Sequence, residues 1–448
     1  MSSTIRNPNQ GIWWLHPAAL FGLAGCVIGV AAYAIPEAAY RDNWRTPKFF
    51  GLPALEITLL CVAVFVFGTL LSSRYLAKFA PPPGEEVPMR WDLVEKLFRL
   101  SVWLAVLGYL IWIGLAIGRG MTWSVALGVL RGEKGAMYDA RFTYLPTVGG
   151  ITTLTEFGSA AAIFGALLGA NIGWSKVRTR LGLIFFLAVL RALMNSERFA
   201  IIELVVPFFI ALLPSLEPSF RRTGAIVRGL IHGAPVIGAI GLLVIFTGFE
   251  YFRSWSNYYA GRDQGLLTFG MLRLLGYYVT SFNNGAYFLG RLNPLNAPYF
   301  TLHFLWGFPL SSPVIKRLFP DPLLDSTDKW FYFPFLDSDA NLEFNNADGM
   351  MFPLMDYGVA GGLLYWFAIA LACGVLYHLY RRKTALGLMV YPIVYLGLLE
   401  VPLALYWGEG RAFPSQILLL AAPLVLWFSR RAERTKHLAP VPAAGVYI

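Results

Sequence analysis

Charged and amide side chains stand where apolar segments end, and these residues are the candidates for chemistry. The turn Asn195-Ser-Glu-Arg198 joins two short apolar runs. Charge so close to lipid is expensive and is usually paired or functional. We therefore take Glu197 and Arg198 as candidate substrate-binding residues. The alternative is a local Glu197–Arg198 pair, or a cross-helix pair, that only orients two helices.

Further arginines lie in or beside apolar, aromatic sequence, and these are Arg253, Arg262, Arg273 and Arg291. The guanidinium group keeps its charge, and its planar fork matches phosphate oxygens. Several such groups around one membrane-facing cavity would suit a lipid diphosphate. The alternative for each of them is contact with lipid headgroups at the membrane surface.

A group of amide and carboxyl side chains leads into a later apolar run. It contains Asn345, Asn346 and Asp348, with Asp356 about two helical turns beyond. Amides and carboxylates suit sugar hydroxyl groups, and Asp348 could take the proton from one of them. Helix capping would explain one of these residues but not all of them.

The turn between the last two apolar runs, Glu409-Gly-Arg411, could line the same cavity. A simple Glu409–Arg411 ion pair is the alternative reading of this turn. Glu156 and Glu400 lie inside apolar runs and have no evident partner in the sequence.

Several common signatures of catalysis are missing from the sequence. There is no GxxxxGK[ST] loop, so ATP hydrolysis is not expected. There is no HExxH motif and no His/Cys cluster, so we expect no metal ion and no other cofactor. Asp337-Ser-Asp339 is interpreted as solvated loop, and His303 as a residue of the membrane surface.

The elements that must position these residues are membrane helices. Of the 448 residues, 57% are hydrophobic and 14% are charged, whereas a soluble domain has about 25% charged residues. The surface is therefore expected to face lipid. The net charge of +10 comes from basic residues scattered in short loops. They form no continuous stripe, so nucleic acid is not an expected partner.

About 20 apolar residues cross the hydrocarbon core of a bilayer as a helix. Runs of this kind predict an all-α polytopic membrane protein with ten spans, near residues 13–35, 52–72, 98–118, 147–170, 181–195, 199–213, 229–249, 352–378, 385–406 and 413–429. No small-residue cleavage site follows the first run, so we expect a span there rather than a removed signal peptide.

Short loops rich in lysine and arginine stay on the cytoplasmic side. The ten-span arrangement puts four such clusters on one side: Lys176/Arg178/Arg180, Arg221/Arg222/Arg228, Arg381/Arg382/Lys383 and Arg430/Arg431/Arg434/Lys436. It places both termini in the cytoplasm and residues 250–350 outside. The basic residues Arg41, Arg45 and Lys48 conflict with it, although Glu37 and Asp42 offset Arg41.

The resulting organisation has spans one to seven in 1–249, an outer loop in 250–350, spans eight to ten in 351–436 and a tail in 437–448. Within the loop, Leu266–Leu292 and Pro298–Phe319 are apolar enough to be amphipathic surface segments, re-entrant segments or a membrane hairpin. A hairpin would give twelve spans with the same orientation. Prolines at 294, 298, 309 and 313 argue against two regular helices, so we favour surface segments.

Three stretches of the sequence carry a family resemblance. They are Asn195-Ser-Glu-Arg-Phe-Ala-Ile-Ile-Glu, then Met271-Leu-Arg-Leu-Leu-Gly-Tyr-Tyr-Val-Thr-Ser-Phe-Asn-Asn, and then Phe344-Asn-Asn-Ala-Asp-Gly with Asp356-Tyr-Gly-Val-Ala-Gly-Gly. They resemble the Ser-Arg turn, the start of the large periplasmic loop and the Asn-containing segment before a span in the O-antigen polymerases (Wzy-type oligosaccharide repeat-unit polymerases). The resemblance covers roughly residues 180–365.

The resemblance implies a GT-C-like fold and glycosyl transfer on the periplasmic face of a bacterial inner membrane. The donor would be a growing glycan on undecaprenyl diphosphate, and the acceptor one lipid-linked repeat unit. The acceptor hydroxyl attacks the anomeric carbon and undecaprenyl diphosphate leaves, without nucleotide or metal. Membrane lipid, a chain-length regulator and a flippase would be the other partners. The product would be O-antigen of lipopolysaccharide, capsule or exopolysaccharide.

The same resemblance assigns roles to individual residues. Arg198, and next Arg273, would bind the diphosphate and stabilise the charge on the leaving group. Asn345, Asn346 and Asp348 would bind sugar, with Asp348 as a base.

Two alternatives stay open. O-antigen ligases share the general plan, but they usually carry a His-Asn pair where this chain reads Asn345-Asn-Ala-Asp348. His303 could serve from elsewhere. A transporter of lipid-linked glycan or of an anionic solute would show inverted repeats and polar residues near the bilayer midplane. No such repeat is evident, and the polar residues gather on one face.

Overall fold

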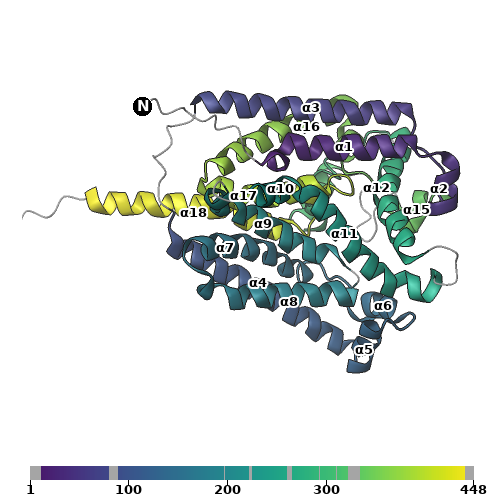
Figure 1. The fold of residues 1–448 in the computed structure, drawn as a ribbon, viewed down its shortest axis with the longest axis horizontal. Coiled ribbons are helices and arrows are strands. Elements are labelled where there is room, and N and C mark those ends of the chain that lie inside the picture. Colours follow the sequence, from purple (N-terminus) through teal and green to yellow (C-terminus); the bar gives the residue numbers. More distant parts are fainter. Residues whose placement is uncertain are drawn as a thin grey trace, which may run out of the picture.

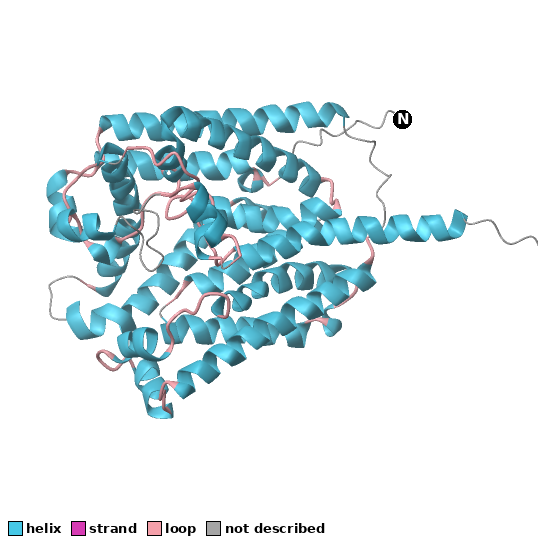
Figure 2. Ribbon diagram, turned by 180° about the vertical axis from the view of Figure 1, so that it is seen from behind, coloured by secondary structure: helices cyan, strands magenta, loops and turns pink. Residues whose placement is uncertain are grey.

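The computed structural model describes residues 12–79, 89–195, 197–220, 224–259, 265–291, 293–308, 310–320 and 333–438. Every regular element within these ranges is a helix. Figure 2 shows the chain from behind as helices and connecting loops. Arg262 and most of the expected tail lie outside the described residues, and so does the side chain of Arg253.

Six helices in the described chain are long and apolar enough to cross a membrane: α1 (Pro17–Ala34), α3 (Leu52–Phe79), α4 (Trp91–Gly118), η3 with α7 (Thr152–Asn171), α9 (Phe199–Phe220) and α16 (Phe352–Arg381). A seventh is formed if α10 (Ala225–His232) and α11 (Ala234–Glu250), which meet at 62°, count together. The expected class, an all-α membrane protein, is therefore confirmed.

Helices also occupy the three other segments that hydropathy predicts as spans. They are α8 (Arg178–Asn195), α17 (Ala385–Glu400) and α18 (Phe413–Leu438). Three arginines lower the hydropathy of α8, α17 has only 16 residues, and the apolar part of α18 ends at Ser429. The ten-span count stays a prediction.

The long helices run side by side, as Figure 1 shows. α1 begins and α18 ends on the left of that view. The opposite end collects the shorter elements α2 (Glu37–Trp44), α5 (Trp123–Arg131), α6 (Ala136–Asp139) and α15 (Phe333–Asp339), together with α12 (Leu266–Arg291). Most of the expected outer loop, residues 250–350, therefore lies at one end of the bundle.

The basic residues that conflict with the orientation rule lie at this same end, and most of their charge is locally engaged. Arg41 pairs with Glu37, with 2.9 Å between Nε and Oε1. Lys48 donates to two carbonyls at the end of α1, those of Tyr33 at 2.6 Å and Ile35 at 2.8 Å. A cation at a helix C-terminus is favourable because the last carbonyls carry negative partial charge.

α12 occupies the first of the two apolar stretches in the expected outer loop. Residues 266–291 form one continuous helix, because the first proline of the segment, Pro294, comes after its end. The helix crosses the right-hand ends of the other helices at a steep angle to α1 (Figure 1). Two short helices follow it, α13 (Phe304–Gly307) and α14 (Ser312–Leu318). The prolines thus break only the second of the two apolar stretches.

Small residues let other elements approach α12 closely. A methyl group added at Gly276 would overlap the indole of Trp44, which also donates from Nε1 to the Leu272 carbonyl at 3.0 Å. One added at Gly285 would lie 2.9 Å from Cβ of Asp348. The glycines therefore fix α2 and the segment before α16 against the same helix.

Candidate functional site

Ion pairs join five residues from separate elements into what we call the five-residue cluster: Glu156, Arg191, Glu197, Glu203 and Arg411. Arg191 of α8 holds Glu197 through two hydrogen bonds of 2.9 and 3.0 Å and Glu156 through one of 2.7 Å. Arg411, from the turn before α18, holds Glu203 of α9 through two bonds of 3.0 and 2.7 Å. Its Nη1 lies 3.0 Å from Glu197.

The five-residue cluster is largely buried and closely paired. Glu156, Arg191 and Glu203 are buried, and none of the five has a buried nitrogen or oxygen without a hydrogen bond. Burial raises the pKa of Glu197, but Arg411 and Arg191 outweigh it and hold that pKa below its ordinary value. Three carboxylates against two guanidiniums leave no surplus positive charge for an anion.

A second set of charges forms what we call the four-residue chain: Arg198, Glu250, Arg273 and Glu343. Arg198 lies 3.1 Å from one oxygen of Glu250, and Arg273 lies 3.6 Å from the other. Arg273 also contacts Glu343 at 2.6 Å. The chain thus joins the turn after α8, the end of α11, the middle of α12 and the η7 turn (Leu342–Phe344).

Aromatic rings support both arginines of the four-residue chain. The guanidinium carbon of Arg198 lies 3.9 Å from the ring centroid of Phe246, and that of Arg273 lies 5.0 Å from the centroid of Phe344. A ring covers the face of a guanidinium group and leaves its N–H edge for an acceptor. Arg273 is buried, yet its Nη2 has no hydrogen-bond partner in the described part of the chain.

The turn 195–198 therefore serves both sets. The structure pairs Glu197 with Arg191 and Arg411, while Arg198 pairs with Glu250. Of the alternatives to a functional role, the cross-helix pairing is thus present for both residues. The chemistry of the two sides differs, because only the four-residue chain offers a buried N–H group that still lacks an acceptor.

The predicted sugar-binding segment packs against α12. Asn284 donates from Nδ2 to the carbonyls of Phe344 at 2.7 Å and Asn346 at 2.8 Å. Asn345 and Asn346 are half-buried. The segment is therefore held by its backbone, and the side chains of these two asparagines remain partly accessible.

Asp348 is fully buried beside α12. Its backbone N–H donates to the Ser281 carbonyl at 3.2 Å, and its Oδ1 accepts from the Met350 N–H at 2.9 Å. Its Oδ2 has no hydrogen-bond partner among the described residues. Burial raises the pKa of Asp348 well above its ordinary value, and the Met350 N–H opposes this only in part. The carboxyl group is thus biased toward its neutral form.

Asp356 has a structural environment in this arrangement. Its carboxylate accepts from the backbone N–H groups of Phe300 at 3.0 Å and Thr301 at 2.8 Å and from the Thr301 hydroxyl at 2.8 Å. Gly358, with φ of 71°, then breaks α16. The carboxylate therefore ties the segment after α12 to the start of α16. Its assignment to sugar stays a prediction.

The structure does not bring all predicted arginines together. Arg291, at the end of α12, is exposed and pairs with Asp339 at 3.2 Å, away from the four-residue chain. Arg411 belongs to the five-residue cluster. Arg198 and Arg273 are the predicted arginines with described side chains that contact the same carboxylate, that of Glu250.

Sequence reasoning missed several residues that hold these sets together: Arg191, Glu203, Glu250, Asn283 and Asn284. Asn283 accepts from the backbone of Phe49 and Phe50 and donates to the Pro47 carbonyl, at 2.6, 3.0 and 2.8 Å. The available signal was a charged or amide residue within an apolar segment, which is costly without a partner.

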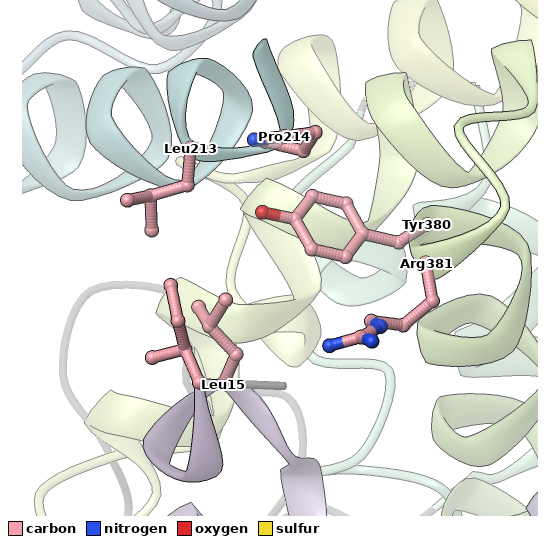
Figure 3. A pocket seen from close by; sticks show the side chains of 6 residues that line it. Leu15, Leu213, Pro214, Tyr380 and Arg381 are labelled. Carbon is pink, nitrogen blue, oxygen red and sulfur yellow. The ribbon is translucent and has the colours of Figure 1, made fainter. Parts of the chain in front are cut away.

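A small pocket lies at the other end of the bundle, between Ile12, Leu15, Leu213, Pro214, Tyr380 and Arg381 (Figure 3). Arg381 ends α16, whereas Asp356 lies near its start. At about 1.5 Å per residue, Arg381 is more than 30 Å along α16 from Asp356, whereas Leu213 is about 15 Å along α9 from Glu203 of the five-residue cluster. The Tyr380 hydroxyl donates to the Ile210 carbonyl at 2.6 Å.

The described residues contain no group of histidine, cysteine and acidic side chains suited to a metal ion. What the site offers is a pair of aromatic-supported guanidinium groups that can bind an anion. Searches against protein-family models, curated proteins and solved structures found no match, so the geometry of this site is the basis for a functional argument.

Proposed function

We propose that this chain polymerises oligosaccharide repeat units carried on undecaprenyl diphosphate, as a glycosyltransferase on the periplasmic face of a bacterial inner membrane. One observation carries the proposal. Arg198 and Arg273, the two residues that the family resemblance assigns to the diphosphate, lie 75 residues apart in the sequence. They nevertheless meet at the same carboxylate, that of Glu250.

The reaction needs little from the protein beyond position and charge. The acceptor hydroxyl oxygen forms a bond to the anomeric carbon of the donor, and the bond from that carbon to the diphosphate oxygen breaks. The electron pair of that bond goes to the diphosphate, whose new charge Arg198 and Arg273 would stabilise. The hydroxyl proton goes to an acceptor group, and Asp348 is the candidate only when ionised.

A glycan-ladder assay tests the proposal. The full chain is purified in detergent and given undecaprenyl-diphosphate-linked repeat units of its host, with no nucleotide added. We expect a ladder of products from the unaltered protein. Removing one group that stabilises developing charge typically lowers the rate by about 100- to 1000-fold, so Arg273→Gln should reduce the ladder by that order.

The matched control is Arg119→Gln. Arg119 ends α4, is exposed, and donates only to the Tyr144 carbonyl, at 3.3 Å, among the interactions of its side chain. The Arg119→Gln substitution removes one positive charge and leaves the four-residue chain unchanged. A correctly folded Arg273→Gln or Arg198→Gln variant that gives a normal ladder would contradict the assignment. Movement of labelled lipid-linked glycan across vesicles, with no ladder, would favour a transporter.

A further inference from the structure

Glu343 differs from the other carboxylate of the four-residue chain in its freedom to move. Glu250 ends α11 and is fully buried. Glu343 lies in the three-residue η7 turn, and its side chain is 35% exposed. Releasing Glu250 would leave a buried charge unpaired. Releasing Glu343 returns its own side chain to solvent, while Glu250 and the incoming anion compensate the charge of Arg273.

The backbone around Glu343 is nevertheless fixed. Asn341 donates from Nδ2 to the Trp44 carbonyl at 2.9 Å, and its Oδ1 accepts from the Glu343 N–H at 3.0 Å. Phe344 is buried and lies under the guanidinium of Arg273. Anchors on both sides hold the turn in place, so the carboxylate of Glu343 can leave Arg273 and return to it without any helix moving.

The carboxylate of Glu343 satisfies Arg273 incompletely. It contacts Nη1, whereas the buried Nη2 has no acceptor among the residues described. A buried N–H group without an acceptor costs free energy. A terminal phosphate has three acceptor oxygens and more negative charge than a carboxylate, so it can engage both nitrogens where Glu343 engages one.

We propose that the Glu343 carboxylate occupies the place of one phosphate group of the ligand and competes with it for Arg273. Binding of a diphosphate displaces Glu343, and return of Glu343 helps to release the diphosphate after transfer. The competition sets selectivity, because a weakly charged anion does not displace the carboxylate. The identity of the lipid rests on the proposed function, but the competition itself requires only an anion.

Calorimetry with inorganic pyrophosphate tests this competition on the full chain in detergent. If an internal group occupies a binding site, only the fraction of protein with that site open can bind the ligand. The apparent affinity is reduced by this fraction. A partly exposed ion pair is worth up to about 1 kcal/mol, so Glu343→Gln should bind pyrophosphate about fivefold more tightly. The same variant should also bind inorganic phosphate measurably, with less discrimination between the two anions.

Two variants complete the test. Glu133→Gln removes an exposed acid between α5 and α6 that lies 4.0 Å from Arg131, and it should leave the affinity unchanged. Arg273→Gln should abolish the binding. A variant that folds poorly binds pyrophosphate less tightly, so misfolding cannot explain tighter binding by Glu343→Gln.

Equal or weaker binding by Glu343→Gln overturns the proposal, and so does the absence of pyrophosphate binding in the unaltered protein. A gain without any glycan ladder would keep the competition and reject the polymerase.

Discussion

The five-residue cluster and the four-residue chain meet at adjacent residues, Glu197 and Arg198, and are made of the same two residue types. In the cluster each arginine spends its N–H edge on carboxylates in two-pronged contacts. In the chain Arg273 contacts Glu250 at 3.6 Å and Glu343 at 2.6 Å. Aromatic rings face the arginines of both sets. The arginines of the cluster are thus more completely paired than Arg273 of the chain.

Unsatisfied polar atoms follow the same division. The five-residue cluster has none among its buried side-chain atoms. Beside α12, however, Arg273 Nη2, Ser281 Oγ and Asp348 Oδ2 are all buried without a partner in the described structure. Buried polar groups are normally paired, so each of these three atoms is a position at which a bound group could supply a partner.

The largest expected effect on stability comes from breaking the ion pairs of the five-residue cluster. Arg191→Met leaves Glu156 buried without its main partner. Breaking a buried pair in this way typically costs about 3–5 kcal/mol, so the variant should lose much of its thermal stability in detergent. The measurement is the temperature at which half of the protein remains monodisperse on gel filtration.

A second substitution separates the contribution of charge from that of packing in the five-residue cluster. Arg191→Met combined with Glu156→Gln removes the stranded charge and should recover part of the stability. The corresponding change at half-buried Arg180, whose side chain donates to the Lys176 carbonyl at 3.4 Å, should have no comparable effect. A double variant no better than the single one would show that Arg191 acts through its bulk.

The next largest effect is the pH dependence of stability caused by Asp348, which packs against α12. The raised pKa of Asp348 means that the folded protein holds a proton which the unfolded chain releases above its ordinary pKa. Stability from this group is complete below about pH 3.8 and is lost as pH rises toward the folded pKa, by up to about 1.4 kcal/mol per pH unit.

The Asp348→Asn substitution removes this loss of stability with rising pH, because the amide does not titrate. Its melting temperature relative to the unaltered protein should therefore rise between pH 4 and pH 7, on the scale of the shift itself. Thermal melts at matched ionic strength give the difference. A constant difference across this range would mean that the Asp348 carboxyl is ionised in the folded protein.

The smallest expected effect tests how α12 is held. Gly276→Ala pushes a methyl group into Trp44, and overpacking of this kind typically costs about 1–3 kcal/mol. Gly290→Ala, on the same helix, has open space around the added methyl group. It should be neutral or gain up to about 1 kcal/mol from helix propensity. Equal stability of the two variants would show that α2 does not pack firmly on α12.

Hydropathy predicted most of the fold because the bilayer imposes it. An apolar run of sufficient length must form a helix to satisfy its backbone, and each predicted run contains one. The elements that hydropathy missed, α2, α5 and α6, are short and mixed in composition. They depend on tertiary contacts, such as Trp44 against Gly276.

The site could be predicted only as a set of residue types. Arg198 and Arg273 stood out because charge beside apolar sequence is costly. Their common partner, Glu250, lies at the end of a helix whose position depends on the packing of α11 against α12. No sequence spacing encodes that contact. Glu156 lacked an evident partner for the same reason, since Arg191 lies 35 residues away.

The pairing of Glu203 with Arg411 spans 208 residues and therefore governs the order in which the chain can be completed. A ribosome delivers Glu156, Glu197 and Glu203 to the membrane with Arg191 as the only matching cation of the cluster. Until Arg411 is synthesised, the charge of two of these three carboxylates is not balanced by an arginine of the cluster. Arg411 is thus the last residue of the cluster to be synthesised, and it completes the pairing of Glu203. We expect chains truncated before it to be degraded by membrane quality-control proteases, even though most of their spans are present.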